Sequence, residues 1–306
     1  KVITPQTIIN CPGQFWFGKR PYHDHLKNGH GNITVYDALE RSSNVFFYKM
    51  GISLGIDKMY DYISSLGIGS KTGIEVPREV SGLMPSAAWK KATIGEEWQG
   101  GENLSVAVGQ GFVQVTPMQM AVAYNAIGLE GEVYRPFVIK KIVDNDGKVL
   151  KENNPVLIRD ISSLQPNGVK VSKETFKFVK EGLRRVVQGD RGTAKSIRQA
   201  AFTMAGKTGT SQVMGFSADQ IYAKCENRPY IQRHHGWFVG WAPADKPEIT
   251  VAAIAEHSCH GATGAGPLVR DTIKAYFEKY HPELFKDKKM KADAVPAAPH
   301  EVIEGE

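Results

Sequence analysis

The run from Glu248 to Ala255 limits the possible folds of this 306-residue chain more than any other stretch. After the glutamate it is apolar at both odd and even positions, apart from one threonine, so neither face of a strand would suit water. Such a strand is expected at the buried centre of a sheet whose two faces are both covered. Two strand candidates precede it, at 200–206 and Gly236–Trp241, and a helix that begins at Pro267 follows it.

The first part of the chain is mainly helical by pattern. Thr34 can cap a helix, with Asp37 three residues later completing a capping box. Thr116 followed by Pro117 is a second strong helix start. This order, helices first and strands last, predicts an α+β fold with an antiparallel sheet. Beyond these starts, the pattern predicts helices over 56–66 and 172–188, a hairpin within 133–158 with arms at Phe137–Ile139 and Val149–Leu150, loops with short helices over 67–111, and irregular chain over 1–33.

Composition excludes several classes of protein. At 42% hydrophobic residues the chain can bury a full core, and we expect one domain over residues 1–284, incomplete at its N-terminus. Residues 285–306 are charged and rich in alanine and proline, which predicts a disordered tail. The net charge of +6 is modest and spread out, which argues against nucleic-acid binding but tolerates anionic substrates. No window approaches the roughly 18 uninterrupted apolar residues of a membrane span.

The three cysteines are too few for a disulfide framework. Cys225 and Cys259 could pair in an oxidising compartment, or all three, including Cys11, could be free thiols.

One lysine stands in a setting that suits chemistry. Lys207-Thr208-Gly209 continues a predicted strand, and the glycines on either side of the Lys-Thr pair let a ligand lie along the backbone. The hydroxyls and N–H groups of Thr208 and Thr210 would suit an anionic, peptide-like substrate. A second copy, Lys71-Thr72-Gly73, has no strand before it, and we interpret it as a loop.

Two further motifs stand at favourable places. Ser42-Ser43-Asn44 falls at a break between two helices, where a hydroxyl and an amide can project into a cleft. The simpler interpretation is helix capping, which serine and asparagine both favour. Gly109-Gln110-Gly111 leads into the capped helix at Thr116.

Together these motifs resemble the penicillin-binding proteins, and more narrowly the class B transpeptidases of the penicillin-binding protein 2 type. The resemblance runs from about residue 8 to residue 280. It implies the penicillin-binding transpeptidase or serine β-lactamase-like fold, with an antiparallel sheet flanked by helices and a mainly helical subdomain. Such enzymes cross-link peptidoglycan stem peptides that end in D-Ala-D-Ala through an acyl-serine intermediate, and β-lactams inhibit them. No catalytic cofactor is implied.

The resemblance also assigns roles. Ser42 and Lys207 would relay a proton toward the leaving amine, and Asn44 would hold the substrate amide. Thr208 and Thr210 would bind the terminal carboxylate, with the Thr210 N–H as one oxyanion donor. The expected catalytic residues are Ser42, Asn44 and Lys207, and the expected substrate-binding residues are Thr208, Gly209 and Thr210.

The chain departs from the family at the nucleophile. No lysine of the sequence has a serine three positions before it, so the Ser-x-x-Lys motif is absent. We therefore expect a truncated or split piece whose nucleophile, together with two early strands, lies upstream of Lys1, and which alone forms no acyl-enzyme. The alternatives are a non-catalytic binding or scaffolding protein on the same fold, or a serine β-lactamase.

The resemblance further implies a partner and a location. Relatives work beside a membrane glycosyltransferase in wall elongation, on the periplasmic face of the inner membrane, held by an N-terminal anchor that this chain lacks. The loop from Ser211 to His235 is expected to line the acceptor side of the cleft.

Some relatives carry a metal-like set of Asp, Cys and His in the N-terminal loop, ending at the middle residue of the Ser-x-Asn motif. Here that residue is Ser43, a poor zinc ligand, so His23 or His25 would have to replace it. A polar loop around a buried cysteine is the alternative. The candidate zinc ligands are Cys11, Asp24 and His30.

Overall fold

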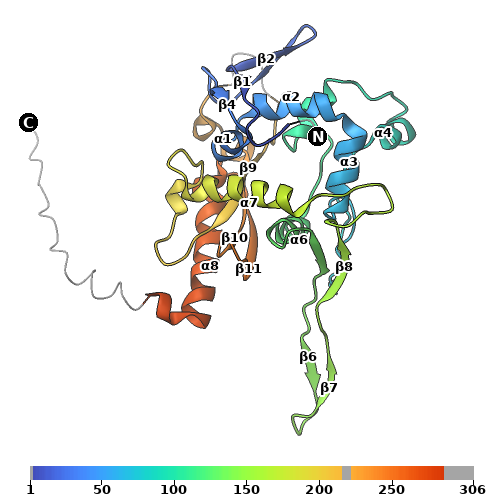
Figure 1. Ribbon diagram of the computed structural model, residues 1–306, viewed down its shortest axis with the longest axis vertical. Helices are drawn as coiled ribbons and strands as arrows, with labels where there is room; N and C mark the ends of the chain where they lie inside the picture. Colours follow the sequence, from blue (N-terminus) through green and yellow to red (C-terminus); the bar gives the residue numbers. More distant parts are fainter. Residues whose placement is uncertain (1–2, 216–221, 286–306) are drawn as a thin grey trace, which may run out of the picture.

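A three-stranded antiparallel sheet forms the centre of the computed structural model, which describes residues 3–215 and 222–285 (Figure 1). The strand order is β11-β10-β9. The α+β prediction is confirmed, and among the described strands β10, rather than the last strand β11, lies between the other two. Their bounds are β9 (Ala205–Ser211), β10 (His235–Ala242) and β11 (Ile249–Ala255), so β9 also begins later than the predicted 200–206.

Helices on both faces explain why β11 is almost entirely apolar, although it pairs on one side only within the described residues. Helix α6 (Pro117–Gly128) packs on one face of β10 and β11, and α8 (Gly266–Tyr280) packs on the other. Helix α7 (Lys173–Gln188) packs against β9. Covered faces demand apolar side chains whatever the position of the strand in the sheet, which is why face patterning alone could not distinguish edge from centre.

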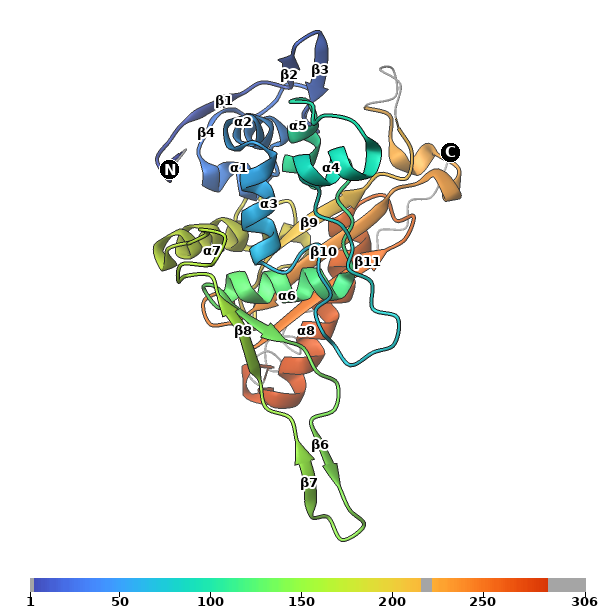
Figure 2. The ribbon, with the colours of Figure 1, turned by 90° about the vertical axis from the view of Figure 1, so that its right-hand side faces the viewer.

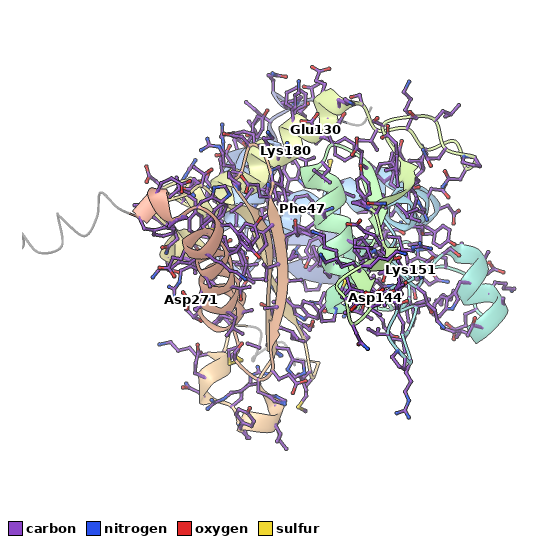
Figure 3. All side chains as sticks on the ribbon, turned by 90° about the horizontal axis from the view of Figure 1, so that it is seen from below. Phe47, Glu130, Asp144, Lys151, Lys180 and Asp271 are labelled. Carbon is purple, nitrogen blue, oxygen red and sulfur yellow. A yellow bond between two sulfur atoms is a disulfide. The ribbon has the colours of Figure 1, made fainter. Side chains whose placement is uncertain are left out.

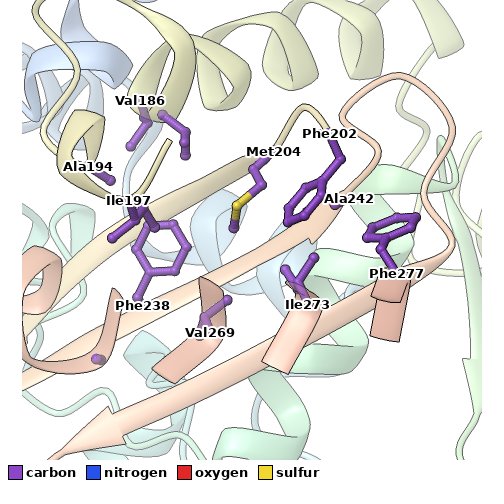
Figure 4. Packing of buried hydrophobic residues seen from close by; sticks show 12 residues of the cluster. Val186, Ala194, Ile197, Phe202, Met204, Phe238, Ala242, Val269, Ile273 and Phe277 are labelled. Carbon is purple, nitrogen blue, oxygen red and sulfur yellow. The ribbon is translucent and has the colours of Figure 1, made fainter. Parts of the chain in front are cut away.

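The main hydrophobic core lies between the sheet and α8. Figure 4 shows Val269 of α8 near Phe238 of β10, and Phe277 of α8 near Phe202, all buried in one cluster. On the opposite face, Trp241 packs near Tyr124 of α6, with ring centroids 6.3 Å apart. Side chains thus cover both faces of β10. The antiparallel pairing with β10 holds β9 at its side.

The helical part lies above the sheet in Figure 2 and carries the predicted caps. Thr34 with Asp37, and Thr116 with Gln119, form the expected capping boxes, and Ser172 caps α7. Short helices occupy the predicted loop region 67–111. They are α4 (Ala87–Ile94) and α5 (Glu102–Ala107). The helices before this region are α1 (Val35–Arg41), α2 (Asn44–Leu54) and α3 (Ile56–Ser65).

The N-terminal stretch is not irregular, as the sequence had suggested, but forms two small ladders. Strand β1 (Ile9–Cys11) pairs with β4 (Gly31–Ile33), and β2 (Gln14–Phe17) pairs with β3 (Arg20–His23). Strands of three or four residues are too short for an alternating pattern to stand out, so this prediction was wrong.

A narrow ribbon projects from the body (Figures 1 and 2). Figure 3 labels Asp144 and Lys151 on this ribbon. It also labels Glu130, just before the ribbon, and Lys180 of α7, whose Nζ lies 3.3 Å from the Glu130 carboxylate. The hairpin prediction is confirmed around its turn, but Phe137–Ile139 is not a strand. The ribbon pairs β5 (Glu132–Arg135) with β8 (Val156–Asp160), and β6 (Lys141–Val143) with β7 (Val149–Glu152).

The short helical turns are η1 (Lys195–Ile197), η3 (Cys225–Asn227), η4 (Tyr230–Gln232), η5 (Gly261–Ala265) and η6 (Pro282–Phe285). Within the described ranges, no helix combines the length and the apolar character needed to cross a membrane. The tail predicted to be disordered lies, beyond Phe285, outside the described residues.

Candidate active site

Ser42 and Lys207 meet although 165 positions separate them in the sequence. Lys207 of β9 donates from Nζ to Ser42 Oγ at 2.7 Å. Ser42 ends α1 in the left-handed backbone region, with φ 58° and ψ 46°. A non-glycine residue rarely adopts this conformation, and such residues cluster at functional sites. The predicted pair therefore joins the helical part to the sheet.

The surroundings of Lys207 change its basicity. Burial lowers the pKa of the amine from 10.5 to about 8. The Nζ atom also lies 3.2 Å from the carbonyl oxygen of Thr208 and 3.4 Å from its hydroxyl. A lysine with a pKa near 8 holds both protonation states in useful amounts near neutral pH, as proton transfer requires.

The predicted substrate-binding residues follow along the edge strand. Thr208 pairs with Thr193 through their hydroxyls at 3.1 Å, and Thr210 is exposed. A Cβ at Gly209 would lie 3.2 Å from the Cβ of Trp237, so only glycine fits there without a shift of the neighbouring strand. The three residues thus lie in line with Lys207 on one strand.

Asn44 is the first residue of α2 and lies beside this pair. Its side-chain amide donates to the backbone oxygen of His23 at 3.3 Å. Helix capping falls to Ser43, whose hydroxyl accepts from the Phe46 N–H at 3.4 Å. The capping alternative therefore holds for the middle residue of the motif, and the Ser42 hydroxyl faces Lys207.

Glu40 and Thr193 support the site; sequence reasoning missed Glu40 and assigned no role to Thr193, which lies in a stretch, Gly192-Thr193-Ala194, that matches the family. The buried carboxylate of Glu40 accepts from the Arg191 N–H at 3.0 Å, and the Thr193 N–H donates to the Glu40 backbone oxygen at 3.1 Å. Through the Thr193 hydroxyl this loop reaches Thr208. A glutamate on a predicted helix two residues before Ser42 gave no signal of this long-range role.

A second cluster lies behind the Ser-x-Asn motif, around the buried Asp24. The Asp24 carboxylate contacts His30 Nε2 and His25 Nδ1 at 3.0 Å each. It also accepts from the Ser43 hydroxyl at 3.0 Å and from the Val45 N–H at 3.1 Å. Asp24 thus ties the N-terminal loop to the start of α2.

The same contacts control protonation in this cluster. Burial alone would raise the pKa of Asp24, but hydrogen bonds from His25 and Val45 and the nearby His30 hold it well below its usual range. Burial lowers the pKa of His30, although the Asp24 carboxylate opposes that shift. In the Asp24–His30 contact the neutral imidazole therefore donates from Nε2 to the ionised carboxylate at neutral pH.

The cluster partly fits a metal. One ligand atom from each of Asp24, His25 and His30 lies within 4.8 Å of the others, and the buried Nδ1 of His30 has no hydrogen-bond partner among the described residues. The predicted ligand Cys11 is buried, but its thiol donates to the Ile9 backbone oxygen at 3.6 Å. His25 rather than His23 thus joins the predicted pair of Asp24 and His30, and Cys11 is not part of the group.

A disulfide joins Cys225 to Cys259, which resolves the pairing that the sequence left open. Beside it, His260 Nε2 lies 2.9 Å from the Glu226 carboxylate. Both contacts fasten the described part of the loop between β9 and β10 to the turn after β11. From the same loop, the Tyr222 hydroxyl lies 3.3 Å from His23 Nδ1, so the loop also reaches the N-terminal ladders.

Comparison with known proteins agrees with this geometry. The model of the penicillin binding protein transpeptidase domain matches residues 1–274. The peptidoglycan D,D-transpeptidase MrdA of Haemophilus influenzae is 32% identical over 290 residues, covering 93% of this chain and 43% of that protein. MrdA of Acinetobacter baumannii is 34% identical over 270 residues, covering 86% of this chain and 38% of that protein. The chain thus spans less than half the length of these curated relatives.

Solved structures show the same similarity. Pseudomonas aeruginosa PBP2, in complex with WCK 5153, superposes with a TM-score of 0.76 at 31% identity, covering 92% of this chain and 57% of that one. Helicobacter pylori PBP2, in a complex with MreC, gives a TM-score of 0.75 at 29% identity, covering 91% and 46%.

Proposed function

Because this chain belongs to the penicillin-binding protein transpeptidase domain family, we propose that it forms the substrate-binding part of a D,D-transpeptidase that cross-links peptidoglycan stem peptides. The observation that carries the proposal is the 2.7 Å contact of Lys207 with Ser42, which joins a lowered-pKa amine to a hydroxyl at the cleft. The strand edge next to this pair suits an extended peptide.

The reaction would run through an acyl-serine. The attacking serine would come from a Ser-x-x-Lys segment, which this sequence does not contain. Ser42 and Lys207 would pass the proton of that serine to the amine of the departing D-alanine, a step that the pKa of about 8 suits. An amine from a second stem peptide would then attack the acyl carbon and release the serine.

Other residues would hold the donor peptide in place. Asn44 would exchange its hydrogen bond to His23 for one to the substrate amide. Thr208 and Thr210 would bind the terminal carboxylate through their hydroxyls. The Thr210 N–H would stabilise the oxyanion, a kind of contact whose removal costs roughly a hundred- to a thousandfold in rate.

Labelling with fluorescent penicillin tests the proposal. We would compare this chain alone with a joined protein, in which the Ser-x-x-Lys segment of the Haemophilus influenzae relative precedes Lys1. The joined protein should carry a covalent label on the added serine, and the chain alone should carry none. A covalent adduct on the chain alone would overturn the assignment of the nucleophile. An unlabelled joined protein that folds cooperatively would favour a scaffolding role instead.

A structural zinc ion is a second proposal, which the buried His30 Nδ1 and its two neighbours support. Asp24, His25 and His30 would hold the ion and so fix the start of α2, beside Ser43. Zinc would act by stabilising the fold, because all three ligands lie behind the Ser-x-Asn motif. The purified chain should contain about one zinc per molecule and lose thermal stability with a chelator, whereas H30A should not respond to chelator. Less than stoichiometric zinc would end this proposal.

We further propose that the complete protein works on the periplasmic face of the inner membrane beside a membrane glycosyltransferase. The disulfide supports an oxidising compartment, because such bonds seldom persist in the cytosol. Alkylation in intact cells without reductant should leave Cys225 and Cys259 unmodified. Modification of both would place the chain in a reducing compartment and contradict the proposal.

A further inference from the structure

Gln110 reaches the strand that carries Lys207. Its side-chain amide donates to the backbone oxygen of Thr210 at 2.8 Å, a contact between residues 100 positions apart. Gln110 follows α5 in the helical part, whereas Thr210 belongs to the sheet. In the described structure, the segment after α5 is thus hydrogen-bonded to the backbone of β9.

The acceptor of this bond lies on the open edge of the sheet. Strand β9 pairs with β10 on one side only, within the described residues. In an antiparallel pair, backbone groups point alternately toward and away from the partner strand. Because the Thr210 oxygen faces Gln110, the N–H and C=O groups of Thr208 and Thr210 point away from β10. An extended peptide would use these groups if it were added to the sheet as a further strand.

Gln110 is placed so that it can move. It stands between Gly109 and Gly111, with φ angles of 74° and 73°, in the region that favours glycine. A Cβ added at Gly109 would meet nothing within 4 Å, and one at Gly111 would meet only the Cβ of Ser105 at 3.4 Å, so the turn is loosely packed. The Gln110 N–H holds the turn to the Ser105 oxygen at 2.9 Å. The side chain can therefore leave Thr210 without the turn unfolding.

We propose that Gln110 competes with the substrate for the edge of β9. Its carboxamide lies against the Thr210 oxygen at the open edge of β9, where the N–H of an extended peptide would approach, so the donor peptide can pair there only when the Gln110 side chain moves away. Gln110 thereby weakens the binding of ligands that pair with the strand, and does not affect ligands that bind only through a carboxylate. This inference rests on the proposed function, because it assumes a peptide substrate at this edge.

Removal of the Gln110 contact should raise the affinity for the peptide, whereas the loss of a contact usually lowers affinity. The net contribution of a single hydrogen bond corresponds to about a two- to tenfold change in an equilibrium constant. Q110M keeps the length of the side chain without its amide, and Q110A removes the side chain beyond Cβ. Both should bind an N-acyl-D-Ala-D-Ala peptide about two- to tenfold more tightly than the unaltered chain.

An NMR titration of the 306-residue chain measures this affinity without a nucleophile, from the amide signals of Thr208 and Thr210. Q165A is the matched control, because the Gln165 amide also donates to a backbone oxygen, that of Asp160 at 2.7 Å, next to the ribbon strand β8. Its affinity should be unchanged. Local damage at position 110 could weaken binding but would not tighten it, so tighter binding in either folded variant supports the competition.

The other outcomes separate the two claims. Equal or weaker binding by Q110M and Q110A, with binding by the unaltered chain, overturns the role of Gln110 and leaves the proposed function standing. If the probe binds to no folded variant at millimolar concentration, the proposed peptide site fails and the role of Gln110 fails with it.

Discussion

The two Lys-Thr-Gly triplets have the same three residues and opposite surroundings. Lys71-Thr72-Gly73 lies in a loop, where the N–H groups of Thr72 and Gly73 donate to the Glu79 carboxylate at 2.7 and 3.1 Å. Lys207-Thr208-Gly209 lies on an edge strand, with its lysine held against Ser42.

The difference lies in where the hydrogen-bonding groups point. In the loop copy, an internal carboxylate uses the backbone N–H groups, and the lysine is exposed to solvent. In the strand copy, pairing with β10 satisfies one set of backbone groups and leaves the alternate set directed outward. The triplet therefore gains a chemical use from the edge of a sheet and from a facing hydroxyl, and its three residues do not supply either.

The largest expected effect separates the two lysines by rate. In the joined protein, K207M should slow acylation by penicillin by roughly a hundred- to ten-thousandfold, the usual contribution of a placed acid–base group. K71M should change that rate less than about twofold, because Lys71 lies in an exposed loop and surface changes of this kind have small effects. The measurement is the second-order rate constant of labelling by fluorescent penicillin.

Thermal unfolding of both variants serves as the control for that comparison. If K207M remains folded and is labelled as fast as K71M, the strand copy has no catalytic advantage over the loop copy. The proton relay through Ser42 would then be wrong.

A smaller effect, on stability, should distinguish Glu40 from Glu79, the glutamates that hydrogen-bond near the strand triplet and the loop triplet. E40A should lower the free energy of unfolding by about 1–3 kcal/mol. The Glu40 side chain is buried, and its removal leaves the Arg191 N–H without its acceptor. E79A should cost about 1 kcal/mol or less, because water can reach the half-exposed loop. Urea unfolding measures both.

E40Q keeps an acceptor oxygen and should recover most of the stability lost in E40A. Equal losses for E40A and E79A would mean that the packing behind Thr208 is no tighter than an exposed loop. The role of Glu40 in placing the strand copy would then be contradicted.

The features that depend on neighbouring residues could be predicted from the sequence, because local chemistry determines them. The capping boxes at Thr34 and Thr116 depend on residues three positions apart, and they form as predicted. The preference for the strand copy of the triplet followed from the apolar residues before it. These features need no knowledge of what lies across the molecule.

The errors come from contacts between distant segments. The apolar pattern of β11 reflects the burial of its two faces by α6 and α8. It does not indicate which position β11 takes in the order of the strands. Glu40 reaches Arg191 across 151 positions, and Gln110 reaches Thr210 across 100. A single sequence without paired positions does not show which residues meet over such separations, so neither contact was predicted, although the motif that contains Gln110 was noticed.

A difference in pH dependence tests the burial of Lys207 without any substrate. The folded-state pKa of about 8 lies below the ordinary 10.5. Below pH 8 the amine is protonated in the folded and the unfolded chain, so it adds no pH dependence. Between about pH 8 and 10.5 the unfolded chain holds a proton that the folded chain has lost, so the free energy of unfolding should rise with pH. K207M should lack this rise and K71M should keep it, as urea unfolding across that range would show. Parallel curves for all three proteins would mean that the strand lysine is as freely hydrated as the loop lysine, and the main physical difference between the two triplets would disappear.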